Sequence, residues 1–183
     1  MAVNESREEV ERYVQSNPGV HFSAIVDGLD QATGQVQHHA ARLVRAGRLE
    51  RETIYGRTHF YPESYDERER IVLALLRRET TRDIVRRLLS ESGRRPADLA
   101  SDLAVARSTV EYHLERLVDH DLIQKDRGAD GRVTVHLTRP QETERLFAEV
   151  EPGAFDRLVD RFERLTDRLL DETAATGETE DAG

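Results

Sequence analysis

Residues 103–117 read LAVARSTVEYHLERL and residues 29–43 read LDQATGQVQHHAARL, so one pattern occurs twice, 74 residues apart. When residues 6–49 are laid on residues 80–123 without a gap, ten positions are identical, where roughly three are expected from average residue usage. The identical pairs are Arg12/Arg86, Ser16/Ser90, Gly19/Gly93, Leu29/Leu103, Ala32/Ala106, Val36/Val110, His39/His113, Arg42/Arg116, Leu43/Leu117 and Val44/Val118. Repetition at a fixed spacing indicates a duplicated structural unit.

Each copy is predicted to contain three helices followed by a hairpin. In the first copy, apolar residues recur at helical spacing, and Asn17-Pro18-Gly19 provides a turn after the first helix. The expected helices are 5–16, 22–29 and 33–46, and the expected strands are 48–55 and 58–61, which turn at Gly56-Arg57. This order of elements predicts a winged helix-turn-helix, which makes nucleic-acid binding the first hypothesis.

The second copy repeats this order with a longer wing. Its expected helices are 82–90, 96–103 and 108–120, and its strands are 122–125 and 132–137, on either side of a wing at 128–131. Between the copies, a leucine-rich helix over 64–78 is expected to pack against one or both winged units and to set their spacing. Short and long helices are expected over 141–150 and 154–171.

The fold class expected is therefore mainly α with small β-wings, comprising two tandem winged helix-turn-helix domains and a C-terminal helical extension. The expected division is 5–62 for the first winged domain, 63–79 for a linker helix, 80–140 for the second winged domain, 141–172 for C-terminal helices with a dimerisation role, and 173–183 for a disordered acidic tail.

The composition excludes several classes of function. There is no cysteine, which excludes disulfides, thiolate metal sites and cysteine nucleophiles. No run approaches the roughly 18 apolar residues of a membrane span, and no basic-then-apolar signal starts the chain. We expect a soluble, cytoplasmic protein without a cofactor. We expect no enzyme either, because there is no glycine-rich phosphate loop and no recognisable nucleophile with its base.

The net charge of −9 is concentrated at the C-terminal end. Residues 141–183 hold 13 acidic and 5 basic side chains, whereas residues 1–140 hold 23 acidic and 22 basic ones and are nearly neutral. Of the 27 basic residues only Lys125 is a lysine. This bias is similar to that of proteins from salt-accumulating halophiles, and an arginine-favouring, GC-rich genome is the alternative explanation. In a halophile, screening of phosphate attraction would make binding depend on shape and base contacts.

Part of the second copy resembles a known family stretch. Residues 103–117, followed by Leu122-Ile123, resemble the recognition helix of the ArsR and MarR winged-helix regulators, which show a Ser-Thr-Val start, a His-Leu pair and an apolar pair opening the wing. Residues 5–140 as a whole resemble the tandem winged-helix regulators of haloarchaea. The resemblance implies a DNA-binding transcription regulator. The first copy departs from the pattern at Thr33-Gly34-Gln35-Val36 and at Ala40.

A helix in the major groove reads bases with side chains near its N-terminal end. The candidate DNA-binding residues of the first copy are Thr33, Gln35, Gln37, His38, Arg42 and Arg45, and those of the second copy are Arg107, Ser108, Thr109, Glu111 and Tyr112. The candidate wing and phosphate contacts are Arg57, Arg94, Arg95, Arg127 and Arg132.

These assignments have structural alternatives. Outward arginines can be only a solvated face, and Glu111 can pair with neighbours one helical turn away. His39 and His113 share one slot of the repeat, which favours a structural role for both. The pair His38-His39 invites a metal-sensor interpretation, but adjacent helical residues point about 100° apart and no thiolate is present. We therefore expect no metal site.

The long C-terminal helix carries apolar residues in alternating steps of three and four, the spacing of a coiled-coil seam. The residues of this seam are Phe155, Leu158, Phe162, Leu165 and Leu169. The seam predicts a homodimer, and packing back onto the linker helix is the alternative.

The sequence predicts a sequence-specific DNA-binding transcription regulator that acts at promoter DNA as a homodimer. The alternative is a winged-helix module that docks onto transcription machinery. The two copies differ in charge, because residues 31–57 have a net charge of +3 and residues 94–132 a net charge of −1. We expect the first copy to hold the DNA backbone and the second to discriminate between sequences.

Overall fold

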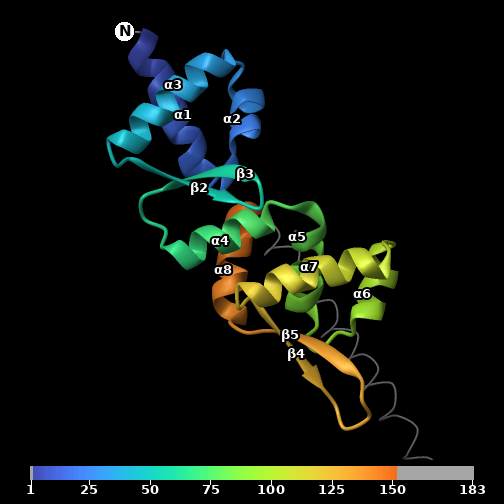
Figure 1. Ribbon diagram of the computed structural model, residues 1–183. Helices are drawn as coiled ribbons and strands as arrows, with labels where there is room; N and C mark the ends of the chain where they lie inside the picture. The colour runs from blue at the N-terminus through green and yellow to red at the C-terminus, as the bar shows by residue number, and fades with distance from the viewer. Residues whose placement is uncertain (1, 152–183) are drawn as a thin grey trace, which may run out of the picture. The chain divides into compact units, whose positions relative to one another are not determined.

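The computed structural model describes residues 2–151 and confirms a mainly helical fold with two small β-wings (Figure 1). The elements follow in the order α1 (Ala2–Ser16), β1 (Val20–His21), α2 (Phe22–Leu29), α3 (Thr33–Arg45), β2 (Leu49–Ile54), β3 (Arg57–Pro62), α4 (Glu67–Leu76), α5 (Glu79–Ser90), α6 (Pro96–Leu103), α7 (Arg107–Asp119), β4 (Ile123–Arg127), β5 (Val133–Leu137) and α8 (Pro140–Val150). The predicted seam over 154–171 and the predicted acidic tail lie outside the described residues.

The first copy packs three helices over a small antiparallel sheet. The sheet has the strand order β1-β3-β2, and the short β1 is an element that sequence periodicity misses because it has only two residues. The core is formed by apolar side chains from the helices and the sheet, namely Val10, Val14, Val20, Ile25, Val36, Ala40, Leu43, Leu49 and Phe60. The helices α2 and α3 lie close to the expected bounds, whereas α1 begins at Ala2 instead of residue 5.

The turn of the first wing lies one residue earlier than expected. Ile54 pairs with Arg57 across the hairpin, so the two turn residues are Tyr55 and Gly56, with φ angles of +49° and +77°. Two consecutive positive φ angles are the geometry of a type I′ hairpin turn, whose twist matches that of the strands. Glycine adopts this conformation without strain, whereas a tyrosine there is unusual.

The backbone of the second copy repeats that of the first. Positive φ angles recur 74 residues apart, at Gly19 and Gly93, at Asp30 and Ala104, and at Gly47 and Asp121. The pairing of Val20 with Phe60 also has a counterpart, a single bridge between residues 94 and 135. The ten identities therefore reflect a duplicated fold, including its strained turns.

Helix α4 joins the two copies through a buried apolar segment. It begins at a capping box, in which the Asp66 carboxylate accepts from the Glu69 N–H and the Glu69 carboxylate accepts from the Asp66 N–H, so it is shorter than the expected 64–78. Residues 72–76 are all buried.

The guanidinium of Arg77 donates to the Pro18 carbonyl at 3.1 and 2.9 Å in the first copy. That of Arg68 donates to the Asp121 carbonyl at 2.9 Å in the second. The helix and the residue that follows it therefore contact both copies.

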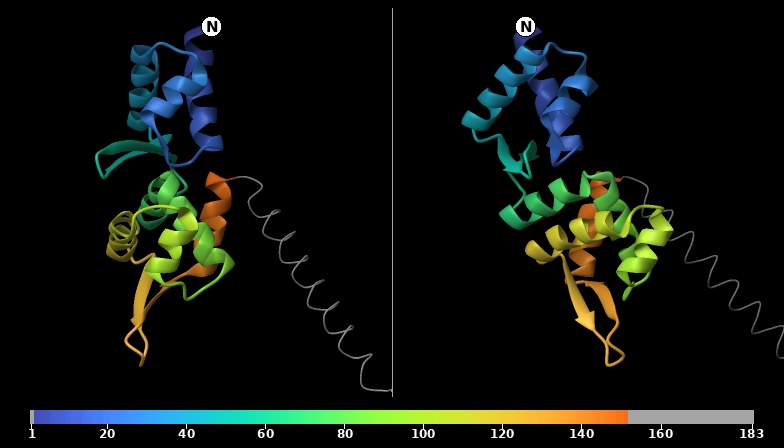
Figure 2. Two further views of the ribbon diagram at one scale, coloured as in Figure 1. Left: turned by 90° about the vertical axis from the view of Figure 1, so that its right-hand side faces the viewer. Right: turned by 45° about the vertical axis from the view of Figure 1, so that its right-hand side comes forward.

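The repeat extends one element further than the ten identities show. With the extra wing residue the spacing becomes 75, and the segment Glu67-Arg68-Glu69-Arg70 of α4 then aligns with Glu142-Thr143-Glu144-Arg145 of α8. Helix α8 packs against α4, where Arg145 forms an ion pair with Glu69. Each copy thus ends in a related helix, and Figure 2 shows these two helices side by side in both views. The gapless comparison misses this pair because the longer second wing shifts the register.

Candidate nucleic-acid interface

Helix α3 presents a polar face to solvent. Its core side is formed by Val36, His39, Ala40 and Leu43, which are all buried. All the base-reading candidates of the first copy are exposed, namely Thr33, Gln35, Gln37, His38, Arg42 and Arg45. Glutamine can bond an adenine edge bidentately in the major groove. The helix contains no acidic residue, so its formal charge is +2.

Most of the cationic side chains around α3 have no ion-pair partner within residues 2–151. Arg42, Arg45 and the wing residue Arg57 are exposed, and none forms an ion pair within residues 2–151. Arg51 on β2 is also exposed and has no ion-pair partner within residues 2–151, although the sequence pattern did not mark it as a candidate. The exposed positions of a strand beside a recognition helix were the signal that could have found it. Arg48, by contrast, is paired with Glu11 at 2.6 Å.

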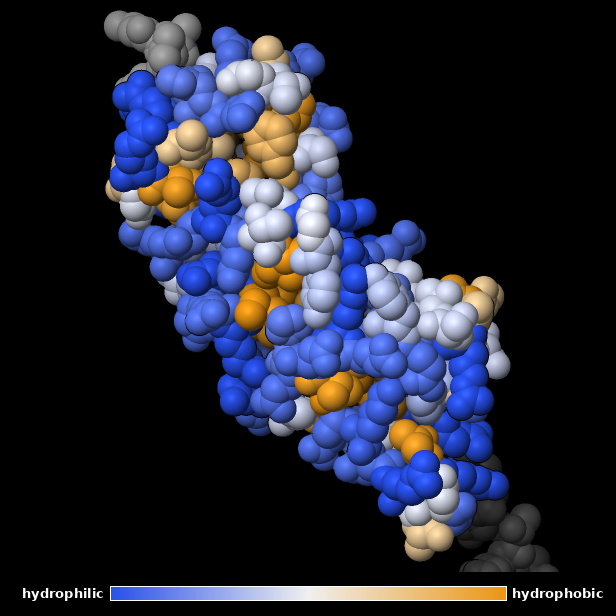
Figure 3. Space-filling view, viewed as in Figure 1, coloured by the Kyte–Doolittle hydropathy of each residue, from blue (hydrophilic) through white to orange (hydrophobic). Residues whose placement is uncertain are grey.

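A groove of about 310 Å³ runs between α3 and the first wing. Gln37 of α3 and Arg51 of β2 lie on its walls, together with the apolar surfaces of Phe22, Ala41 and Phe60. The groove therefore brings a base-reading candidate and an unpaired cation together. The face of the molecule drawn in Figure 3 is mainly hydrophilic, with hydrophobic residues in small separate groups.

Helix α7 presents a different surface at the same positions. Arg107, Ser108 and Tyr112 are exposed, whereas Thr109 and Glu111 are partly buried. The carboxylate of Glu111 accepts from Lys125 at 2.9 Å and lies 4.0 Å from the Arg107 guanidinium. The structure thus favours the ion-pair interpretation of Glu111 over base reading.

The difference in charge between the two helices arises at equivalent positions of the repeat. Gln37, Ala41 and Arg45 of α3 correspond to acidic residues in α7, which are Glu111, Glu115 and Asp119. With Arg107 and Arg116 as its cations, α7 has a formal charge of −1 against +2 for α3. The formal charges would therefore favour a phosphate backbone at α3 over one at α7.

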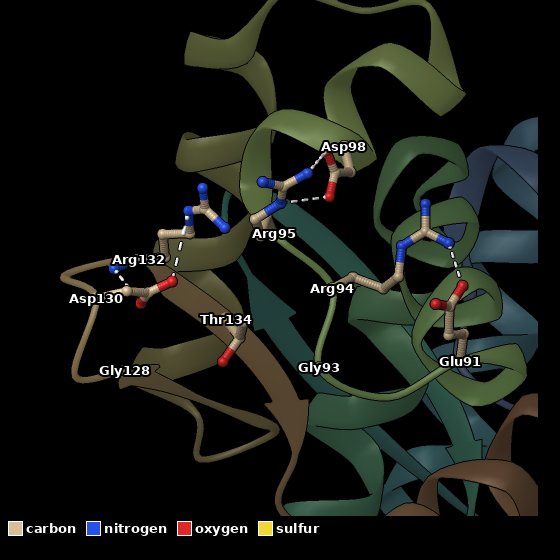
Figure 4. A pocket seen from close by; sticks show the side chains of 9 residues that line it. All are labelled: Glu91, Gly93, Arg94, Arg95, Asp98, Gly128, Asp130, Arg132 and Thr134. Atoms are coloured by element: carbon tan, nitrogen blue, oxygen red, sulfur yellow. Dashed lines mark hydrogen bonds and ion pairs between the residues drawn. The ribbon is translucent and has the colours of Figure 1, made fainter.

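Three of the four wing and phosphate candidates of the second copy, Arg94, Arg95 and Arg132, line a hollow of about 650 Å³ between the start of α6 and the second wing (Figure 4). Each arginine there already has a carboxylate partner. Arg95 forms two bonds to Asp98, at 2.7 and 2.9 Å. Arg132 lies 3.5 Å from Asp130. Arg94 pairs with both Glu91 and Asp102. A phosphate would have to displace these acids, whereas the exposed Arg127 on β4 has no such partner within residues 2–151.

Three buried or half-buried histidines lie in surroundings that favour a structural role. His59 of β3 donates from Nδ1 to the Gly19 carbonyl at 2.7 Å, and burial lowers its pKa although this bond acts in the opposite direction. Burial also lowers the pKa of His39 and of His113, whose Nδ1 lies 2.9 Å from the Thr81 hydroxyl. The structural role expected for the repeated slot fits both residues, although only His113 has a hydrogen-bond partner there.

Within residues 2–151 no group of three or more histidine or carboxylate side chains could hold a metal ion. Over the same part of the chain, no helix is both long enough and apolar enough to cross a membrane.

Comparison with known proteins agrees with this geometry. A family model described as an N-terminal HTH domain matches residues 4–73, and one described as a helix-turn-helix domain matches residues 75–125. An uncharacterized HTH-type transcriptional regulator of Methanocaldococcus jannaschii is 28% identical over 138 residues, which are 74% of this chain and 34% of that protein. The chain thus spans about a third of the length of this relative.

Two solved structures are also similar. A transcriptional regulator from Thermotoga maritima matches with 18% identity and a TM-score of 0.38, over 63% of this chain and 88% of that one. The transcriptional regulator SlyA matches with 16% identity and a TM-score of 0.33, over 53% and 78%. The two consecutive family matches overlap the two copies of the fold, so the chain contains two tandem helix-turn-helix domains.

Proposed function

We propose that this protein is a sequence-specific DNA-binding transcription regulator, and that α3 and the first wing form its main DNA contact. The observation that carries the proposal is the set of four exposed arginines around α3 without a carboxylate partner in the described chain, namely Arg42, Arg45, Arg51 and Arg57. When an unpaired arginine meets a DNA phosphate, it releases a counterion from the DNA, and no ion pair within the protein has to be broken first.

The polar residues of α3 supply the sequence preference in this proposal. Gln35, Gln37 and His38 are exposed in the first half of the helix, where base edges are read in a major groove. The acidic groups of α7 and the paired arginines beside α6 give the second copy a smaller share of the backbone contact than the first. The expected division gave the backbone contact to the first copy and the discrimination between sequences to the second, whereas this proposal gives both roles to α3.

The test is a binding assay with pools of random duplex DNA and with fragments of the host genome, carried out at several KCl concentrations. We expect an enriched sequence, and we expect Gln37→Ala to relax the preference at one position by about 1–3 kcal/mol. A chain that binds all duplexes alike at every salt concentration would contradict the proposal.

A second candidate function is docking onto transcription machinery through the second copy. The observation that favours it is the acidic character of α7, whose Glu115 and Asp119 are exposed. Alanine substitution of Arg42 and Arg45 is compared with that of Arg107 and Arg132. If neither pair of substitutions changes DNA affinity, docking is the better account.

We propose further that the protein is a homodimer through the apolar seam of residues 155–169. The support is the spacing of Leu158, Leu165 and the other seam residues in the sequence. A dimer would present two copies of α3 to one operator. Sedimentation equilibrium checks this proposal, with a monomer expected for Leu158→Glu/Leu165→Glu. A wild-type mass of one chain at micromolar concentration refutes it.

A further inference from the structure

The turn of the first wing contacts the recognition helix of the second copy. The Tyr55 hydroxyl lies 3.0 Å from Nε2 of His120, at the end of α7, and the two rings meet edge to face with centroids 5.7 Å apart. The guanidinium of Arg116 lies 4.0 Å from the ring centre of Tyr55 and 4.0 Å from that of Tyr112. Arg116 is therefore held between a tyrosine of each copy.

The backbone of the turn is held as well. The guanidinium of Arg78 donates to the carbonyls of Ile54 and Tyr55, at 3.3 and 3.2 Å. The side chain of Tyr55 is 38% exposed, so it does not occupy its place to fill a core. It also has the positive φ that favours asparagine or glycine. A tyrosine in this strained position is explained by its contacts with α7.

Two of the α7 side chains at this contact occupy positions whose counterparts in the first copy are DNA-binding candidates. Arg116 occupies the slot of Arg42, and Tyr112 occupies that of His38. In α3 these side chains are exposed and open to a ligand, whereas in α7 the arginine is stacked against Tyr55. Nucleic acid that binds the Arg116 guanidinium must first displace the stacked ring of Tyr55.

We propose that Tyr55, Arg116, Tyr112 and His120 form an intramolecular lock that withholds the Arg116 guanidinium of α7 from DNA, so that α3 makes the main DNA contact while the lock is closed. The inference rests on the proposed function and adds a regulation of it. Opening the lock frees both elements at once, the wing turn of the first copy and the recognition helix of the second. The expected result is a longer DNA footprint and a higher affinity.

The existence of the lock is tested without DNA. Tyr55→Asn removes the ring but suits the positive φ of the turn, and it is combined with Arg116→Ala in a double-mutant cycle followed by chemical unfolding. We expect the combined loss of stability to be smaller than the sum of the two single losses. Tyr55→Phe, which keeps the ring, should retain most of the coupling. Additive losses overturn the proposal.

The effect on DNA is tested by cysteine protection, because the wild-type chain contains no cysteine. Ala41→Cys, at an exposed position of α3, and Glu115→Cys, at the equivalent position of α7, report through the rate of alkylation with and without duplex DNA. With Tyr55 present, we expect DNA to slow alkylation at Ala41→Cys several-fold and to leave that at Glu115→Cys unchanged. With Tyr55→Asn, DNA should slow both, and affinity should rise about tenfold, since the competent fraction increases.

Ser64→Ala, an exposed position after β3 and outside both the lock and the first wing, is the matched control and should behave as wild type. Equal protection of both cysteines in the wild-type background overturns the lock. If DNA protects neither cysteine in any background, the proposed function fails, and the regulation that rests on it fails as well. The unfolding cycle still decides separately whether the contact between the copies exists.

Discussion

Removing Arg42 and Arg45 should weaken DNA binding in a way that depends strongly on salt. Four arginines around α3 are exposed and without an ion-pair partner in the described chain. If each meets one phosphate, the slope of log K against log[KCl] is about −3.6, and it falls to about −1.8 when two are replaced by alanine. The same relation predicts an affinity loss of about 20-fold near 0.2 M KCl and almost none near 1 M.

Fluorescence anisotropy with a labelled operator duplex, over a series of KCl concentrations, measures both slopes. The matched control is Arg107→Ala/Arg132→Ala, because these arginines are paired with Glu111 and Asp130. The control should change the slope by less than one. Each single substitution at an exposed position should change stability by at most about 0.5 kcal/mol, so a melting curve verifies the fold. Equal slopes for the α3 double variant and the wild type would refute the reasoning.

Three further predictions concern stability. Leu73→Ala should lower the free energy of unfolding by about 2–5 kcal/mol in urea titrations, because the side chain is fully buried in α4. A loss below about 1 kcal/mol would contradict the buried packing of α4. Gly19→Ala should also destabilise, by about 1–3 kcal/mol, because φ is +75° and the new Cβ would lie 2.9 Å from that of Leu73; Gly47→Ala, which has open space, is the comparison. Burial lowers the pKa of His59 from its ordinary 6.5, so the stability it contributes is complete above pH 6.5 and decreases as the pH falls below that value. His59→Gln should flatten the fall in melting temperature between about pH 7 and 5, and an unchanged pH profile would show that His59 does not cause it.

Much of the fold could be predicted because it depends on local patterns. The bounds of α2 and α6 follow from turn residues and helical spacing, and they agree with the structure to the residue. The exposed face of α3 follows from the same periodicity. The turn at Tyr55-Gly56 was placed one residue late, since the register of a hairpin depends on cross-strand pairing and not on the position of glycine alone.

The state of each candidate side chain could not be predicted from the sequence. The charge counts indicate that the first copy is more basic, but not that Glu111 of α7 is paired with Lys125 of β4, or that Arg51 has no ion-pair partner within residues 2–151. Ion pairs depend on which side chains approach within about 4 Å, and several partners come from different elements.

The sequence by itself determined that this chain contains two helix-turn-helix units of one origin, because hydrophobic periodicity and turn chemistry act over a few residues. Only the tertiary structure decided that the units share α4 as a buried junction and that the wing turn of the first copy meets α7 of the second. Tyr55 and His120 are 65 residues apart in the chain. Their contact depends on the packing of every element between them, and no local pattern encodes it.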